Sequence, residues 1–125
     1  MAWYFENDRS IYIQLVEQIQ NRIAIGDYPP GSRLASVREL AQEAEVNPNT
    51  MQRALAELER MGLVHSQRTS GRFVTEDEGR IQSMKRETAK KAIRSFLEQM
   101  THLGFEQHEI LDLIREEQEV SEDEQ

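Results

Sequence analysis

The apolar residues in the first half of the chain recur every three or four positions in three stretches, which places them on one face of a helix. The stretches cover residues 10–26, 36–44 and 47–62. Each starts with a side chain that can cap a helix N-terminus: Ser10, Ser36 and Asn47. The pattern therefore predicts three helices, the last two separated by a tight turn at Glu45-Val46.

Two short strands are predicted after the third helix. Leu63–Ser66 starts with strand-forming residues, Arg68-Thr69-Ser70-Gly71 has the composition of a turn, and Arg72–Val74 forms the return strand. The order helix, helix, tight turn, helix, strand, turn, strand is that of a helix-turn-helix followed by a β-hairpin wing. Residues 1–75 are therefore predicted to form a winged helix-turn-helix DNA-binding domain.

The remaining 50 residues show two further helical patterns, separated by Gly104. The first is a long apolar repeat, and the second is a shorter helix near residues 107–118. The last ten residues hold six acids and no base, so residues 119–125 are predicted to be an acidic, disordered tail. The predicted fold is mostly α with a small β-wing, with a two-helix dimerisation part over residues 76–118.

The third helix opens with polar side chains that suit a DNA-reading helix. Asn47 and Pro48 mainly build its N-terminus, and Arg53 points away from its apolar face. Amide, hydroxyl and guanidinium groups in this position meet base edges and phosphates in helix-turn-helix proteins. The candidate base readers are Asn49, Thr50 and Gln52. Asn49 and Thr50 could instead only extend the cap, and the two roles can coexist.

The net charge of −8 at first argues against a nucleic-acid partner, but the charge is unevenly distributed. Residues 1–75 hold eight arginines, no lysine and nine acids, whereas residues 76–125 hold seven bases and fourteen acids. Arginine binds phosphate and guanine through a planar fork, which fits a specific reader. The alternative function is a winged-helix protein-interaction module that does not bind DNA. In that case the arginines should scatter over the surface, whereas in a DNA-binding domain they should gather on one face.

Each of the two predicted C-terminal helices has an apolar face along its length. Two helices alone cannot bury such a face. Pairing with a second copy across a two-fold axis would cover it, so we expect a homodimer. The same pairing would place two recognition helices about one DNA turn apart, roughly 34 Å, on an inverted-repeat operator. The residues expected at this dimer interface are Ile81, Met84, Ile93, Phe96, Met100, Leu103, Leu111 and Ile114.

Several runs together resemble the GntR family of winged helix-turn-helix regulators over roughly residues 9–75. They are Tyr28-Pro29-Pro30-Gly31-Ser32-Arg33-Leu34-Ala35-Ser36-Val37-Arg38-Glu39-Leu40-Ala41, Val46-Asn47-Pro48-Asn49-Thr50, Ala54-Leu55-x-Glu57-Leu58-Glu59-x-x-Gly62-Leu63 and Gly71-Arg72-Phe73-Val74. By length and pattern, the remaining 50 residues resemble the C-terminal part of the YtrA-type subfamily. The resemblance implies a dimeric bacterial transcription regulator, most often a repressor, and often one that controls a transporter operon.

The resemblance also implies a set of DNA contacts. They are Arg38 on the second helix, Asn47, Asn49, Thr50 and Gln52 at the recognition helix, and Gly71 with its neighbours in the wing. Arg53 and Arg68 are expected to touch phosphates, which set position rather than sequence. Arg72 could either reach a minor groove from the wing or remain solvated.

The chain departs from the family pattern at three positions. Ala35 stands where proline is usual, Glu45 where the bend usually has glycine, and Thr69 where the wing usually has glycine. A left-handed backbone at Glu45 would cost on the order of 1 kcal/mol. Thr69 puts the wing conformation in question.

The sequence shows no feature of an enzyme. It has no cysteine, no glycine-rich phosphate loop and no spacing of nucleophile and base, so no cofactor is expected. Two pairs at helical spacing, Glu98 with His102 and His108 with Asp112, could hold a metal, but ordinary surface charge explains them better. We therefore expect no metal site.

No signal peptide and no apolar run of about 20 residues is visible, so a cytoplasmic protein with no membrane partner is expected. The remaining 50 residues, arranged in two helices, leave little room for an enclosed effector pocket. A small effector would then sit at the dimer interface or between the two parts, or none exists.

Overall fold

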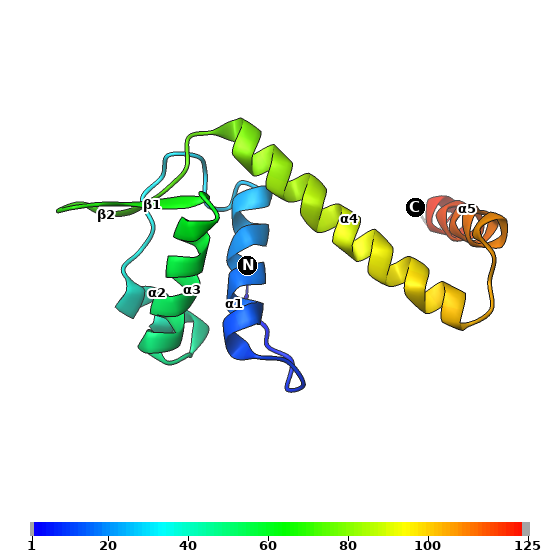
Figure 1. Ribbon diagram of the computed structural model, residues 1–125, viewed down its shortest axis with the longest axis horizontal. Helices are drawn as coiled ribbons and strands as arrows, with labels where there is room; N and C mark the ends of the chain where they lie inside the picture. The colour runs from blue at the N-terminus through cyan, green and yellow to red at the C-terminus, as the bar shows by residue number, and fades with distance from the viewer. Residues whose placement is uncertain (1, 124–125) are drawn as a thin grey trace. The chain divides into compact units, whose positions relative to one another are not determined.

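The computed structural model describes residues 2–123, which fall within two compact units, Met1–Lys85 and Arg86–Gln125. The described residues form five helices and one two-stranded antiparallel sheet (Figure 1). The elements in order are α1 (Ile11–Ala24), α2 (Val37–Ala44), α3 (Pro48–Arg60), β1 (Val64–Gln67), β2 (Gly71–Val74), α4 (Glu78–His102) and α5 (Gln107–Asp123). The prediction of a mostly helical fold with a small β-wing is confirmed.

The first three helices begin where their caps predict. The Ser36 hydroxyl accepts the Glu39 backbone N–H at 3.1 Å and donates to the Glu39 carboxylate at 3.0 Å. The carboxylate therefore contacts the Ser36 side chain, whereas a full capping box would bring it to the Ser36 backbone. At the start of α3 the Asn47 side-chain oxygen accepts the N–H of Asn49 at 2.8 Å. These caps satisfy N–H groups that have no partner within the helix.

The turn between α2 and α3 uses a left-handed residue that is not glycine. Glu45 has φ 57° and ψ 46°. Among the described residues it is the only non-glycine with a positive φ. Its N–H donates to the Gln42 carbonyl, and the N–H of Val46 donates to the Ala41 carbonyl at 3.0 Å. The helix end therefore keeps its carbonyls paired, at a backbone cost of about 1–2 kcal/mol.

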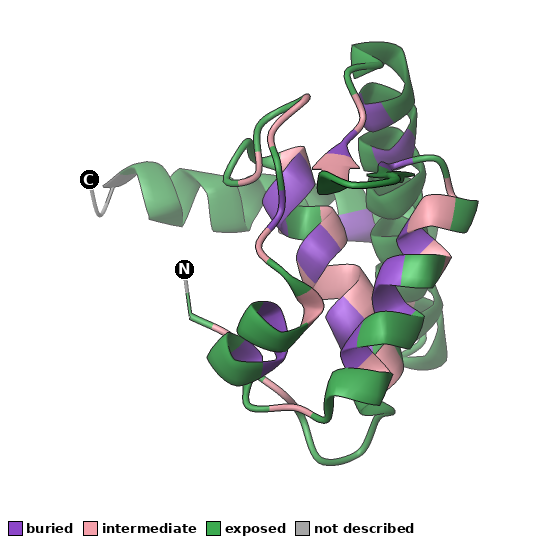
Figure 2. Cartoon of the chain, turned by 90° about the vertical axis from the view of Figure 1, so that its left-hand side faces the viewer, coloured by how far each residue is buried: buried purple, intermediate pink, exposed green. Residues whose placement is uncertain are grey.

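The core of the first unit lies between α1, α2 and α3, and the base of the wing closes it. α3 packs against both α1 and α2, and Figure 2 shows buried residues on one side of each helix and exposed residues on the other. The most deeply buried large side chains are Leu15, Ile19, Ile23, Leu40, Met51, Leu55, Leu58, Leu63 and Val74. Burial of this face fixes the opposite face of α3 toward solvent.

The first turns of α4 belong to the winged-helix unit, which extends to Lys85 rather than ending at residue 75. Ile81 and Met84 are 5% and 9% exposed and lie in the hydrophobic core of this unit. Their predicted place at the dimer interface is therefore wrong, because this chain already buries them. Arg80 adds a polar tie: its guanidinium donates to the carbonyl of Met61, where α3 ends.

The helix α5 is longer than predicted. It continues to Asp123, so residues 119–123 are helical and the predicted tail is wrong for them. Glutamate is a good helix former, so the acidic residues at the end of α5 do not by themselves prevent a helix. Residues 124–125 of the predicted tail lie outside the described residues.

The other predicted dimer-interface residues remain uncovered within this chain. Met100 is half-buried, and the exposed members are Ile93 (55%), Phe96 (39%), Leu103 (71%), Leu111 (48%) and Ile114 (38%). Such a run of exposed apolar side chains marks a surface that another group can cover. None of the described helices combines the length and the apolar character needed to cross a membrane.

Candidate nucleic-acid interface

The N-terminal turns of α3 present the predicted base readers to solvent. Asn47, Asn49, Gln52 and Arg53 are exposed, and Thr50 is half-buried. The opposite face of the helix, which includes the buried Met51, Ala54, Leu55 and Leu58, anchors it in the core. The polar groups are thus held on a rigid element, as a helix that enters a major groove requires.

Arg38 lies in the first turn of α2 and is exposed. Its neighbour Glu39 is hydrogen-bonded to Ser36, and Arg38 forms no ion pair with any described residue. The guanidinium is therefore available to a phosphate or a guanine edge.

The eight arginines of residues 1–75 divide into two groups. Arg9, Arg60 and Arg72 form ion pairs with glutamates, and the buried Arg22 lies 3.9 Å from the centroid of the Trp3 ring and pairs with Asp27. The other four have no acidic partner among the described residues: Arg33, Arg38, Arg53 and Arg68. All four lie on α2, on α3, in the wing turn or on the segment beside the wing. This distribution favours a DNA-binding surface over the protein-interaction alternative.

Arg53 rests on an aromatic ring. Its guanidinium carbon lies 4.5 Å from the centroid of the Tyr12 ring, which α1 provides. A cation held over a ring in this way loses conformational freedom but keeps its outward N–H groups. The contact therefore holds the guanidinium of Arg53 at the edge of the predicted reading face.

The wing is an antiparallel hairpin that a third extended segment supports. β1 and β2 pair from Val64 with Val74 to Gln67 with Gly71. On the other edge of β2, Leu34 donates to the Arg72 carbonyl at 2.9 Å, and Arg33 forms a bridge with Phe73. The wing is thus connected to the segment that leads into α2.

This arrangement reveals Arg33 as a candidate that the sequence analysis did not select. Gly71 has φ 101°, and a Cβ added there would lie 3.2 Å from Nε of Arg33. Gly71 therefore serves both the turn geometry and the close approach of a cation. The available signal was the position of Arg33 directly before the buried Leu34, but pairing between residues 33 and 73 depends on tertiary structure.

Thr69 does not disturb the wing turn. The N–H of Ser70 donates to the Gln67 carbonyl at 3.2 Å, and Thr69 keeps a negative φ. Only Gly71 takes up the positive φ in this hairpin, so the glycine usual at position 69 is not needed. Arg68 is exposed within the turn.

Arg72 has a structural role that neither sequence interpretation included. Its Nε donates to the Glu59 carboxylate of α3 at 2.8 Å, and its side chain is 19% exposed. The Ser66 hydroxyl donates to the same carboxylate, and Ser66 is the register partner of Arg72. Glu59 therefore ties both wing strands to the recognition helix. Arg72 is neither simply solvated nor held free for a minor groove.

Replacing Glu59 with glutamine is expected to lower the stability of the first unit at neutral pH by about 1 kcal/mol or less. The hydrogen bond from Ser66, with a smaller contribution from Arg72, holds the pKa of the Glu59 carboxyl below its ordinary value. Its stabilisation is therefore complete above about pH 4.3, the ordinary glutamate pKa, and is lost as the pH falls through the lowered pKa. Thermal unfolding of the wild-type chain and of Glu59→Gln between pH 3 and 7 measures the difference in their stability. This difference should become smaller toward acid pH.

Glu57 provides the matched control for this substitution. It lies on the same helix and pairs with Arg60 of that helix, so it does not reach the wing. Glu57→Gln should leave the affinity for DNA unchanged, whereas Glu59→Gln should weaken it because the wing loses its tie to α3. Equal effects of the two substitutions on DNA affinity would contradict the tether.

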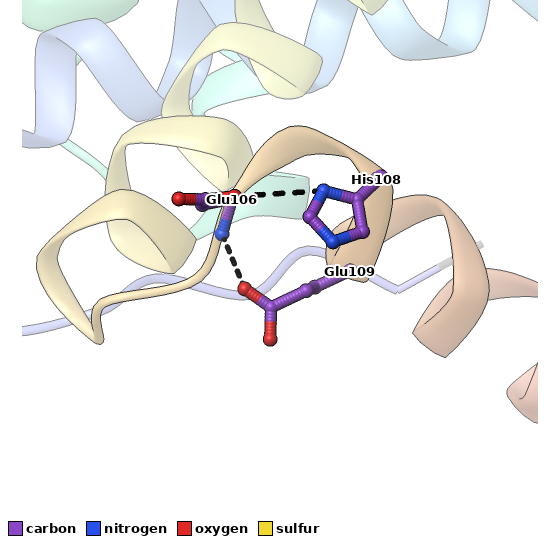
Figure 3. A group of neighbouring side chains, drawn as sticks. All are labelled: Glu106, His108 and Glu109. Carbon is purple, nitrogen blue, oxygen red and sulfur yellow. Dashed lines mark hydrogen bonds and ion pairs between the residues drawn. The ribbon is translucent and has the colours of Figure 1, made fainter.

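A group of possible metal ligands occurs at the start of α5, where Figure 3 shows Glu106, His108 and Glu109. One ligand atom from each lies within 4.8 Å of the others, and all three residues are exposed. The Glu109 carboxylate accepts the backbone N–H of Glu106 at 3.0 Å, which is the reciprocal half of a capping box. Helix capping therefore explains the geometry. The group differs from both pairs that the sequence suggested.

The second unit contains an open apolar hollow of about 510 Å³. Phe96 and Met100 of α4 line it together with residues of α5: Leu113, Ile114, Glu117, Gln118 and Ser121. It is an open surface hollow of this chain, formed by the same apolar face that the dimer interface was predicted to use.

Comparisons with known proteins agree with this geometry. The sequence profile described as "Bacterial regulatory proteins, gntR family" matches residues 11–74. The chain is 36% identical over 111 residues to the uncharacterized HTH-type transcriptional regulator YhcF of Bacillus subtilis, covering 89% of this chain and 92% of that protein. It is 40% identical over 67 residues to the HTH-type transcriptional repressor YtrA of the same organism, covering 54% of this chain and 52% of that protein.

Solved structures show the same similarity. A GntR family transcriptional regulator from Listeria monocytogenes superposes with a TM-score of 0.84 at 38% identity, covering 90% of this chain and 98% of that one. The DNA-binding domain of AraR in complex with the operator ORX1 matches with a TM-score of 0.52 at 27% identity. That match covers 60% of this chain and 99% of the AraR domain, whose structure was solved with the operator bound.

Proposed function

Because the chain belongs to the GntR family of bacterial regulatory proteins and is a DNA-binding transcription regulator, we propose that it acts as a homodimeric repressor on an inverted-repeat operator. The observation that carries the proposal is the placement of unpaired cations and amides on α2, α3 and the wing. Repression is supported by the likeness to YtrA, which is described as a repressor. From the resemblance to the YtrA-type subfamily, we further propose that the regulated target is a transporter operon.

The contacts follow from the exposed groups. Base edges in the major groove are read by Arg38, Asn49, Thr50 and Gln52. Asn47 places the N-terminus of α3 against the DNA backbone. Arg53 and Arg68 bind phosphates, and Arg33 joins them beside Gly71 in the wing. Arg and Asn make the bidentate contacts that distinguish bases, whereas phosphate contacts hold the register.

Dimerisation occurs through the exposed apolar face of the second unit. Ile93, Phe96, Leu103, Leu111 and Ile114 are each at least 38% exposed. A symmetric pair of copies would remove this surface from water, and apolar burial is the main favourable term in such association. The hollow beside Phe96 then becomes part of the interface, where a small effector could be enclosed between two copies.

Selection of bound sequences from random duplex DNA tests the function. We expect an inverted repeat whose half-sites lie about 10 base pairs, or a multiple of that, apart. A selected pool without any repeated motif would contradict sequence-specific binding. Footprinting on genomic DNA then identifies the regulated genes.

The affinity for the selected operator should fall steeply with salt. Each phosphate that the protein neutralises contributes a slope of about −0.9 to a plot of log affinity against log salt. Substituting Arg53 with glutamine should reduce the slope for a dimer by about two, one unit per subunit, while the preferred sequence stays the same. Fluorescence anisotropy between 50 and 300 mM NaCl measures this slope. A changed preferred sequence would instead make Arg53 a base reader.

A further inference from the structure

The second unit separates charge between its two helices. From residue 86 to residue 94, α4 carries four bases, Arg86, Lys90, Lys91 and Arg94, against the single acid Glu87. The helix α5 carries seven acids and one base, Arg115. Charge of opposite sign is therefore concentrated on neighbouring elements of the same unit.

These charges do not neutralise one another within the chain. Among the described residues, the ion pairs of this unit are short-range: Glu87 with Lys90, Asp112 with Arg115, and Glu106 with His108. None of them joins α4 to α5. Both charged surfaces are exposed, so each remains available to a partner of opposite charge.

The charges border the exposed apolar face. Arg86, Lys90 and Arg94 follow at four-residue spacing and form one stripe along α4, beside the apolar stripe of Ile93 and its neighbours. On α5, Glu116 and Glu117 flank the half-buried Leu113, and Glu117 lines the apolar hollow. Charges at the edges of an apolar helix face form the interhelical ion pairs that set partner choice and orientation.

We propose that the α4 basic stripe of one copy pairs with the acidic edge of α5 from a second copy, and reciprocally across the two-fold axis. The proposal rests on the homodimer of the proposed function and specifies how its copies meet. Contact of α4 with its own counterpart at residues 90–94 would bring Lys90 and Arg94 of both copies together. Contact of α5 with its counterpart would likewise oppose glutamates. Like charges across an interface are costly, whereas the crossed pairing matches opposite charges around the apolar centre.

Two charge-reversal variants of the full chain test the pairing. The first carries Lys90→Glu and Arg94→Glu, and the second carries Glu116→Lys and Glu117→Lys. Each alone should raise the dimer dissociation constant at least about tenfold, because each opposes like charges at both crossed contacts. An equal mixture should form a heterodimer in which half of the crossed contacts join reversed charges and half join native ones. Analytical ultracentrifugation with one variant fluorescently labelled measures both quantities.

The controls separate the possible failures. Circular dichroism confirms that both variants keep their helices, and Glu43→Lys on α2 should leave the dimer unchanged. If the variants dimerise like the wild-type chain, or if their mixture forms no heterodimer, the crossed pairing is overturned while the homodimer stands. If the wild-type chain is monomeric both free and on its selected DNA, the homodimer itself fails and the pairing fails with it.

Discussion

Replacing Arg38 with alanine is expected to remove about 1–3 kcal/mol of binding free energy at each half-site, so the dimer, which loses two such contacts, should bind the selected operator at least about 25-fold more weakly. The same range is expected for Asn49→Ala. Both side chains are exposed on the helix-turn-helix, and Arg38 has no acidic partner among the described residues. If the proposed contacts are correct, their loss removes hydrogen bonds to DNA but no contact that holds the fold. Fluorescence anisotropy at fixed salt gives the affinity.

Arg60 is the matched control for Arg38. It is also an exposed arginine of the helix-turn-helix, but it lies at the C-terminal end of α3 and pairs with Glu57. Arg60→Ala should change operator affinity by less than about threefold, since an exposed pair of this kind contributes little. Thermal unfolding should show that all three variants remain folded. Wild-type affinity in both Arg38→Ala and Asn49→Ala would refute the assignment of the reading face.

The second large effect is expected from Ile81→Ala, which should destabilise the winged-helix unit by about 2–5 kcal/mol. Ile81 is 5% exposed and lies in the core of that unit, so its truncation leaves a cavity. Ile93 lies on the same helix and is 55% exposed. Ile93→Ala makes an identical change in helix propensity, so the difference between the two variants isolates the effect of burial.

Chemical denaturation at two protein concentrations distinguishes the two roles. Ile81→Ala should lower the midpoint by a similar amount at both concentrations. Ile93→Ala should instead weaken the dependence of stability on concentration, because stability gained from dimerisation follows mass action. If Ile93→Ala proved as damaging as Ile81→Ala at the lower concentration, the exposed face would have to be covered within the chain itself.

The helix caps and the apolar periodicity are the parts of the fold that could be predicted from sequence. Ser36 and Asn47 act on N–H groups within three residues of themselves, so their role is local. At Glu45 the family resemblance raised a left-handed backbone only as a condition, and the structure has one there. The predicted end of the last helix was wrong. An acidic segment with few apolar residues can either continue a helix or form a tail, and the local sequence does not decide between these two outcomes.

The candidate site was predicted in part. The exposure of Asn49 and Arg38 follows from helical periodicity, because their positions oppose buried residues of the same helix. The roles of Arg72 and Arg33 could not be predicted, because one depends on Glu59 thirteen residues away and the other on Gly71 in a separate segment. An arginine in isolation looks the same whether it binds a phosphate or a neighbouring carboxylate.

The sequence by itself determined where the first three helices begin, which face of each is buried, and that a hairpin follows them. These features depend on residues within about one helical turn or one hairpin, where the spacing of side chains is fixed by the backbone. Only the tertiary structure decided that Ile81 and Met84 belong to the winged-helix core, that Glu59 ties the wing to α3, and which arginines remain available to DNA. Those outcomes depend on contacts between segments distant in sequence, and such contacts are set by packing and charge pairing in three dimensions.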